Sequence, residues 1–250
     1  MYTLKKSLGQ HFLKDEAICR RIVEILKENP HDRLVEVGPG GGALTKYLLK
    51  LPGIDFRCIE IDQEKVGYLV QIFPALKDKI IHADILQCPM PFSDPFTVIG
   101  NFPYNISTEI VFKMLEWRDY VNRMIGMFQR EVAMRLAAKE GNKVYGVTSV
   151  LVQAFFKVDY LFEVEEQAFN PPPKVKSAVI RFTPLATPVV MKDQRSLSIL
   201  VKAAFGQRRK TLRNSVKPYF KPEILAEALF GRRAEQLSVE EFGQLTFRMN

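Results

Sequence analysis

Cysteine and histidine are scarce in this chain. It has three cysteines, Cys19, Cys58 and Cys88, with no Cys-x-x-Cys pair, and three histidines in 250 residues. An odd number of widely spaced cysteines argues against a disulfide framework, and so few potential ligands argue against a zinc site or any other metal centre. This usage is typical of a protein of the reducing cytoplasm.

Long apolar runs are also missing. The chain contains no stretch of about 18 apolar residues, and its first ten residues lack the apolar core of a signal peptide. A hydrophobic share of 47% beside 26% charged residues is typical of a well-cored soluble protein and not of a disordered chain. We therefore expect a cytoplasmic protein without a membrane segment.

The positive charge is concentrated at the C-terminal end. The net charge is +8, and residues 190–250 contain 12 Lys and Arg against 6 Asp and Glu, which is +6. Arg208, Arg209, Lys210 and Arg213 lie within six residues and in a register compatible with a helix. Such a cluster predicts a phosphate-contacting surface for a nucleic acid, and a solvated helix face is the alternative.

The N-terminal half predicts a doubly wound parallel sheet. Residues 33–37 form a short β-rich run, the glycine-rich segment 38–42 follows at once, and a helical pattern covers residues 43–50. Further strands are expected at 56–61, 79–83 and 96–100, with a helix over residues 63–73 between the first two. In this arrangement ligands bind outside the carboxyl ends of the strands, where a glycine turn lets the backbone approach them.

Four polar or glycine positions lie at or just after the ends of these predicted strands. Gly38, Glu60, Asp84 and Asn101 all fall at the carboxyl edge of the sheet. The glycine segment lacks the clean Gly-x-Gly-x-x-Gly spacing of dinucleotide folds and has no Walker ending. Glu36 would repel a diphosphate but tolerate a sulfonium. The spacing favours S-adenosylmethionine, while nicotinamide binding and a fold relative that binds neither remain open.

The segment 98–107, Val-Ile-Gly-Asn-Phe-Pro-Tyr-Asn-Ile-Ser, begins within the predicted fourth strand and continues beyond its end. Pro103 biases Phe102 toward an extended conformation, so the carbonyls beside it are held rigidly. Asn101 offers a side-chain carbonyl and Tyr104 an aromatic face, with Phe169 as a candidate second wall. Acceptors beside an aromatic platform suit a flat heterocycle with an exocyclic amine. An ordinary strand-to-helix loop is the alternative.

The second half predicts a change of architecture. Residues 145–156 fit a buried helix or a long apolar strand, and residues 177–182 fit a closing antiparallel strand at the sheet edge. Thr187-Pro188 begins a boundary, so we expect a catalytic domain over 1–187 and a helical RNA- or ribosome-binding domain over 188–250. Helices are expected at 196–205, 207–216, 222–230 and 238–247.

Assembled in order, these segments resemble the KsgA-type ribosomal RNA adenine dimethyltransferases nearly from end to end. The matching segments are Gly9-Gln10-His11-Phe12-Leu13, Glu36-Val37-Gly38-Pro39-Gly40, Glu60-Ile61-Asp62, Asp84, residues 100–107, Phe169 with residues 171–173, and residues 205–215.

The resemblance implies a fold and an activity. The fold is an α/β, Rossmann-like S-adenosylmethionine-dependent methyltransferase fold with a mostly parallel seven-stranded sheet and a small C-terminal all-α domain. The activity is dimethylation of two neighbouring adenines near the 3′ end of small-subunit (16S) ribosomal RNA, in complex with the small ribosomal subunit, by an enzyme expected to be a monomer. Residues carried over as donor-binding are His11, Leu13, Gly38, Glu60, Asp84 and Asn101.

Two positions depart from the family, which often has Asn at position 11 and Leu at position 102. His11 can still hydrogen-bond the carboxylate of the donor, and Phe102 contributes chiefly its backbone carbonyl. The nearest rival is a large-subunit adenine methyltransferase of the antibiotic-resistance type. A non-catalytic checkpoint factor of ribosome assembly belongs to another class, and DNA methylation is disfavoured because no base-reading module is recognisable.

Overall fold

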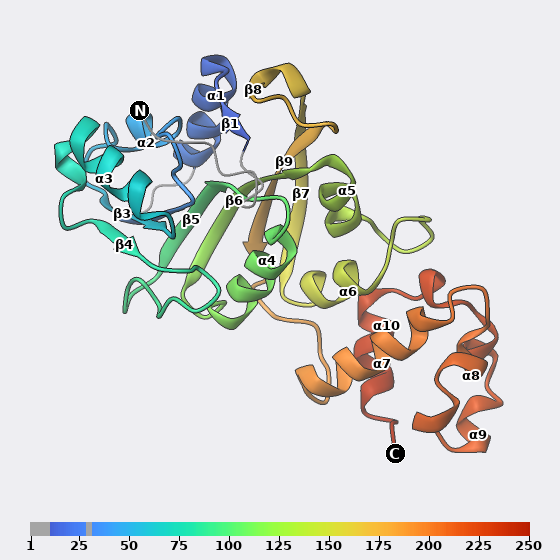
Figure 1. Ribbon diagram of the computed structural model, residues 1–250. Helices are drawn as coiled ribbons and strands as arrows, with labels where there is room; N and C mark the ends of the chain where they lie inside the picture. Colours follow the sequence, from blue (N-terminus) through green and yellow to red (C-terminus); the bar gives the residue numbers. More distant parts are fainter. Residues whose placement is uncertain (1–10, 29–31) are drawn as a thin grey trace. The chain divides into compact units, whose positions relative to one another are not determined.

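The computed structural model describes residues 11–28 and 32–250 (Figure 1). Gly9, Gln10 and the predicted helix end at residues 29 and 30 lie outside the described residues. The chain divides into two compact units. One consists of Met1–Ala133 with Asp159–Thr183, and the other of Met134–Val158 with Pro184–Asn250.

The first unit is organised on a seven-stranded sheet of order β4-β3-β2-β5-β6-β9-β7. Strands β2 to β6 are parallel, and β9 runs antiparallel to β6. The expected α/β fold with a mostly parallel seven-stranded sheet is confirmed. The strands are β2 Arg33–Val37, β3 Asp55–Glu60, β4 Ile80–His82, β5 Phe96–Asn101, β6 Val121–Gln129, β7 Phe156–Val164 and β9 Ser177–Pro184.

The strand order reverses direction at β2, which lies between β3 and β5. In open α/β sheets the connections on the two sides of such a point diverge, which leaves a crevice at the carboxyl ends of the strands. A separate two-stranded sheet pairs β1, Phe12–Leu13, with β8, Phe169–Asn170. This pairing joins the N-terminal segment to residues from the second half of the chain.

Short helices connect the strands. Helix α1 begins where Asp15 accepts hydrogen bonds from the backbone N–H groups of Ala17 and Ile18, at 2.9 and 3.2 Å, as an N-cap residue does. One face of α1 then buries Cys19, Ile22, Val23 and Leu26. The helices of this part are α1 Glu16–Lys27, α2 Thr45–Leu48, α3 Gln63–Ile72, α4 Ser107–Glu116 and α5 Arg130–Ala137, with 3₁₀ turns η2 Pro74–Leu76 and η3 Glu166–Ala168.

The second unit is mainly helical and also contains the end of α5 and the first residues of β7. Its helices are α6 Val147–Gln153, α7 Gln194–Gly206, α8 Leu212–Ser215, α9 Pro222–Leu225 and α10 Val239–Thr246, with 3₁₀ turns η4 Lys217–Tyr219, η5 Ala228–Gly231 and η6 Ala234–Gln236. Helix α6 packs on α7 and α10. This unit therefore includes Met134–Val158, which lies on the N-terminal side of the boundary expected at residue 188.

Three local expectations are wrong in detail. Strand β9 is not at the sheet edge, because β7 pairs beyond it. The predicted helix 207–216 is reduced to α8, and the predicted helix 222–230 is broken into α9 and η5. Periodicity could not resolve residues 145–156, which form α6 and the first residue of β7.

Two features are absent from the part of the chain that the structure describes. None of the helices found there is both long and apolar enough to cross a bilayer. The same residues contain no group of three or more His, Cys, Asp or Glu side chains placed to hold a metal ion.

Candidate active site

A cavity of about 550 Å³ lies at the carboxyl ends of β2, β3 and β5, within the size range of small-molecule sites. Three of the residues expected to act on the target base, Phe102, Pro103 and Tyr104, line it. The residues expected to bind the donor also line it, and they are His11, Leu13, Gly38, Glu60, Asp84 and Asn101. The residues predicted to act on the base and those predicted to bind the donor therefore share one cavity.

The glycine turn after β2 forms one wall. Gly38 and Gly40 have φ angles of +69° and +56°, which side-chain-bearing residues rarely adopt. A Cβ atom on Gly40 would lie 2.8 Å from the ring of Phe12, so β1 can approach the turn only because this position is glycine. Residues 38–40 line the cavity at this turn.

Glu60, at the end of β3, ties this turn to its own strand. Its Oε2 accepts a hydrogen bond from the backbone N–H of Gly40 at 3.2 Å, and its Oε1 accepts one from that of Asp62 at 3.0 Å. Each carboxylate oxygen has a second lone pair. Glu60 is thus rigidly held and can still accept hydrogen bonds from the hydroxyl groups of a ribose.

Glu36 is a second acidic residue of the cavity and is only 2% exposed. Burial, reinforced by the negative charge of Glu60, raises its pKa to about 8, although a hydrogen bond from Thr45 opposes the shift. The Thr45 hydroxyl donates to Glu36 Oε2 at 2.6 Å. This carboxyl group is therefore mostly protonated at neutral pH, and a positive charge in the cavity would favour its ionised form.

Asp84 and an apolar shelf complete the donor side. The backbone N–H of Leu86 donates to Asp84 Oδ1 at 2.9 Å, which orients the carboxylate. Ile61 and Ile72 also line the cavity, although they are 51% and 40% exposed. Such apolar surface suits the face of a purine. No sequence pattern marks these two isoleucines as part of a site, because isolated apolar residues beside a strand or at a helix end resemble ordinary core positions.

Asn101, the last residue of β5, faces the cavity from the other side. Its Nδ2 donates to the backbone carbonyl of His11 at 3.0 Å. The amide is thereby oriented, and its Oδ1 accepts no hydrogen bond from any of the residues that the structure describes. Asn101 therefore presents an unused acceptor to the cavity.

Phe102 directs its ring away from the cavity and into the sheet. It is 1% exposed and lies 5.2 Å from Phe128 between ring centroids. The space for this ring exists because Gly100 and Gly126 have no side chains, and a Cβ on either would overlap it. This packing fixes the backbone of Phe102, whose carbonyl is the group expected to act.

Phe169 does not fulfil its predicted role in this structure. It is fully buried in the hydrophobic core, pairs with Leu13 through β8, and does not line the cavity. The aromatic ring that faces Tyr104 is instead that of His11, with centroids 5.4 Å apart and planes inclined by 28°. Sequence spacing could not reveal this pair, because the two residues meet only in the folded chain.

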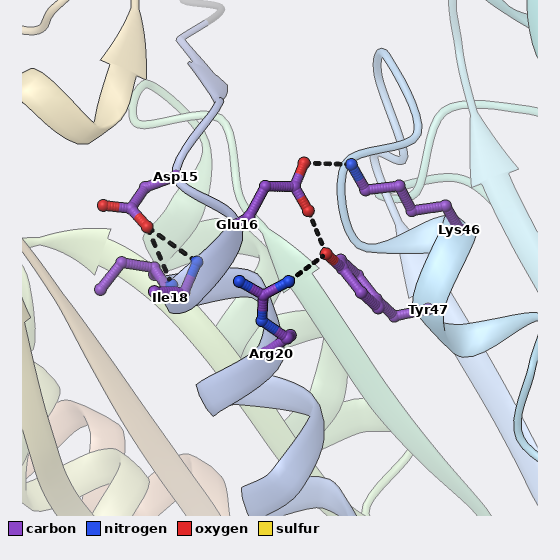
Figure 2. Close-up of polar contacts among 7 residues, drawn as sticks. Asp15, Glu16, Ile18, Arg20, Lys46 and Tyr47 are labelled. Atoms are coloured by element: carbon purple, nitrogen blue, oxygen red, sulfur yellow. Dashed lines mark hydrogen bonds and ion pairs between the residues drawn. The ribbon is translucent and has the colours of Figure 1, made fainter.

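A polar cluster joins α1 to α2 near the cavity (Figure 2). Glu16 accepts hydrogen bonds from Lys46 and from the Tyr47 hydroxyl, and these bonds lower the pKa of Glu16. Arg20 donates to the same hydroxyl at 3.4 Å. Glu16 and Lys46 also line the cavity. This cluster could not be predicted from the sequence, because exposed charges on helices have no distinctive spacing.

The four predicted RNA-contacting cations differ in their surroundings. Arg208 to Lys210 lie in the turn after α7 and not on a helix. Arg208 donates to the backbone carbonyl of Lys143 and lies 3.6 Å from Glu235, and Arg213 donates to the carbonyl of Leu225 at 2.7 Å. Arg208 and Arg213 thus support the second unit itself. Arg209 and Lys210 are exposed and remain the clearer candidates for phosphate contacts.

The cavity fits S-adenosylmethionine. Its acidic residues Glu60 and Asp84 suit the ammonium group and the ribose hydroxyls of that molecule and would repel a polyphosphate, and the sulfonium would favour the ionised form of Glu36. The glycine turn lets the protein backbone approach the molecule, and the apolar surface of Ile61 and Ile72 accommodates its adenine. The fold and the site together define a Rossmann-like, S-adenosylmethionine-dependent methyltransferase.

Comparison with known proteins agrees with this class. The family model for ribosomal RNA adenine dimethylase matches residues 1–246. The ribosomal RNA small subunit methyltransferase A of Flavobacterium johnsoniae is 50% identical over 246 residues, covering 97% of this chain and 94% of that protein. Its counterpart in Cytophaga hutchinsonii is 49% identical over 246 residues, covering 97% and 95%. The chain therefore belongs to the ribosomal RNA adenine dimethylase family and methylates adenines of ribosomal RNA.

Solved structures show the same fold. A dimethyladenosine transferase from Plasmodium falciparum has a TM-score of 0.79 at 23% identity, with 96% of this chain and 99% of that chain covered. The 23S rRNA methyltransferase ErmE has a TM-score of 0.76 at 23% identity, with 95% and 99% covered. At these identities the likeness concerns the fold alone.

Proposed function

We propose that this enzyme dimethylates the N6 amines of two adjacent adenines near the 3′ end of small-subunit ribosomal RNA during ribosome maturation. The observation that supports the chemistry most directly is the shared cavity, in which Asn101 to Tyr104 face the glycine turn. Donor and acceptor can therefore meet in one cavity.

The proposed mechanism requires positioning more than proton transfer. S-adenosylmethionine supplies a methyl group that its sulfonium already activates. Asn101 Oδ1 and the Phe102 carbonyl accept the hydrogens of the target amine, which aligns the nitrogen lone pair with that methyl group. Tyr104 stacks on the extruded base. The surplus proton leaves to water once the nitrogen has become cationic, so a dedicated base is not needed.

The small subunit is the favoured substrate. The relatives that are 46% to 50% identical to this chain are named small-subunit methyltransferases, whereas the large-subunit enzyme ErmE is only 23% identical. The exposed Arg209 and Lys210 would contact RNA phosphates. We also propose that the enzyme acts in the cytoplasm as a monomer, which light scattering of the purified protein can test.

Separated ribosomal subunits provide the decisive assay. Immature small subunits, large subunits and protein-free RNA are each incubated with the enzyme and isotopically labelled donor, and the modified nucleotides are mapped by mass. The proposal expects dimethyladenosine at two neighbouring positions of the small-subunit RNA. Label confined to large subunits would support the rival enzyme. Binding of small subunits and donor without transfer would support a checkpoint factor.

A further inference from the structure

Tyr104 is held from two directions by groups that come from distant parts of the chain. Its hydroxyl lies 2.5 Å from the hydroxyl of Ser177, and its ring stacks on His11. The His11 ring is fixed in turn, because its Nδ1 lies 2.8 Å from the backbone carbonyl of Pro171. The turn after β5, the N-terminal segment and the start of β9 therefore meet at this tyrosine.

Ser177 provides a rigid support. It is fully buried, is the first residue of β9 and pairs with Gln129 of β6, so the central sheet determines its position. Tyr104, in contrast, lies in a turn between β5 and α4. Burial raises the pKa of Tyr104, so the phenol is protonated at neutral pH and can donate its hydrogen to Ser177.

The spacing of the two rings leaves one face of Tyr104 for a base. Carbon atoms in contact lie about 3.5–4 Å apart, so a base between two rings needs about 7 Å between them. The His11 and Tyr104 centroids are only 5.4 Å apart. A target adenine cannot enter between them and has to stack on the opposite face of Tyr104.

We infer that Ser177 and His11 are positioning residues that hold the ring of Tyr104, so that the target adenine stacks only on the face turned away from His11. This inference rests on the proposed function, because it assigns the support of the base-stacking residue. His11 also lines the donor side of the cavity, whereas Ser177 does not. Ser177 therefore gives the cleaner test.

The test is a double-mutant cycle of Ser177→Ala and Tyr104→Phe. Each change removes one hydroxyl of the same hydrogen bond and keeps the aromatic ring. We expect each single variant to lower kcat on small subunits by about tenfold, as expected for a lost buried hydrogen bond, and the double variant to lose no more than either alone. The dissociation constant of S-adenosylmethionine, measured by calorimetry, should change by less than about twofold.

Ser149→Ala is the matched control. Ser149 is also fully buried, and its hydroxyl donates to the carbonyl of Arg135 at 2.5 Å, but it belongs to the second unit. The thermal stability of this variant should fall about as much as that of Ser177→Ala while kcat is unchanged. The inference would be overturned if the kcat losses of the two single variants multiplied in the double variant, or if Ser177→Ala had the kinetics of the wild type. It would also be overturned if Ser177→Ala lowered the affinity for S-adenosylmethionine as much as it lowered kcat.

A spectroscopic measurement keeps the two proposals separate. Ultraviolet titration of the tyrosine side chains, compared with that of Tyr104→Phe, gives the pKa of Tyr104. This pKa reports the hydrogen bond to Ser177 in the absence of substrate. When the phenol ionises, the Ser177 hydroxyl can donate to it, which lowers the pKa of Tyr104. Ser177→Ala should therefore raise this pKa further, and an unchanged titration would refute the support by Ser177. Wild-type enzyme that leaves small subunits unlabelled would instead refute the proposed function, and the titration would still decide the inference.

Discussion

Asn101 donates a hydrogen bond to the backbone carbonyl of His11, although 90 positions separate the two residues in sequence. This bond uses the amide nitrogen and leaves the oxygen for the substrate. It also links the N-terminal segment to the strand that ends in the predicted catalytic motif, so the two sides of the cavity are held together.

Asn101→Ala should lower kcat by about 10²–10³-fold, in the range seen when one transition-state hydrogen-bonding group is removed. Donor affinity should fall much less, because the other groups that bind the donor remain. Single-turnover methylation and calorimetry measure the two effects. Asn122→Ala, an exposed position on β6, is the matched control, and equal losses of rate and donor affinity would contradict the proposed role.

Glu36 should make stability depend on pH. Its pKa is about 8 in the folded protein against an ordinary 4.5, so the folded state holds this proton more tightly than the unfolded state. The resulting stabilisation is present at low pH and is lost as pH rises from about 4.5 to about 8. Urea denaturation at several pH values should show Glu36→Gln gaining stability relative to wild type across this range. If the free energies of unfolding of the wild type and Glu36→Gln changed in parallel with pH, the raised pKa of Glu36 would be contradicted.

Gly126→Ala should destabilise the sheet, because the added methyl group would overlap the ring of Phe102 and lie 2.6 Å from that of Phe128. Overpacking of this kind costs about 1–3 kcal/mol. Adding Phe102→Leu should recover part of the loss, since the smaller side chain vacates the space. Gly67→Ala in α3 has open space for its Cβ and serves as the control in thermal denaturation. A Gly126→Ala variant as stable as this control would contradict the packing argument.

Arg209→Glu combined with Lys210→Glu should weaken binding to small subunits and reduce its salt dependence, by about 0.7 in log–log slope for each phosphate that is no longer neutralised. The melting temperature should be unchanged, because both residues are exposed. Arg208→Glu should instead lower the melting temperature, because Arg208 donates to the Lys143 carbonyl. If the double variant bound small subunits as tightly as the wild type, Arg209 and Lys210 would be excluded as contacts to RNA phosphates.

Glu16→Gln should raise KM for the donor a few-fold and leave kcat unchanged. It weakens the interaction of α1 with Lys46 and Tyr47 beside the cavity, and exposed ion pairs contribute at most about 1 kcal/mol. Glu24→Gln is the matched control, because Glu24 pairs within α1, with Lys27 at 2.7 Å. A fall in kcat without a change in KM would show that Glu16 acts elsewhere.

Four residues of the predicted donor site could be placed together because each lies at or just after the end of a strand. The carboxyl ends of parallel strands share one edge, so Gly38, Glu60, Asp84 and Asn101 could be placed together from spacing alone. The role of Phe169 could not be judged in this way. Whether a residue beside a proline segment reaches the cavity or the core depends on the β1–β8 pairing, which joins residues far apart in sequence.

The sequence by itself determined the alternation of strands and helices, the glycine turn and the order of motifs that identify the family, because these are local patterns. Only the tertiary structure decided which ring faces Tyr104, that Ser177 supports it, and that Arg208 and Arg213 bind backbone carbonyls of their own unit. These relationships are contacts between segments distant along the chain, and they arise from packing and buried hydrogen bonds that local periodicity does not encode.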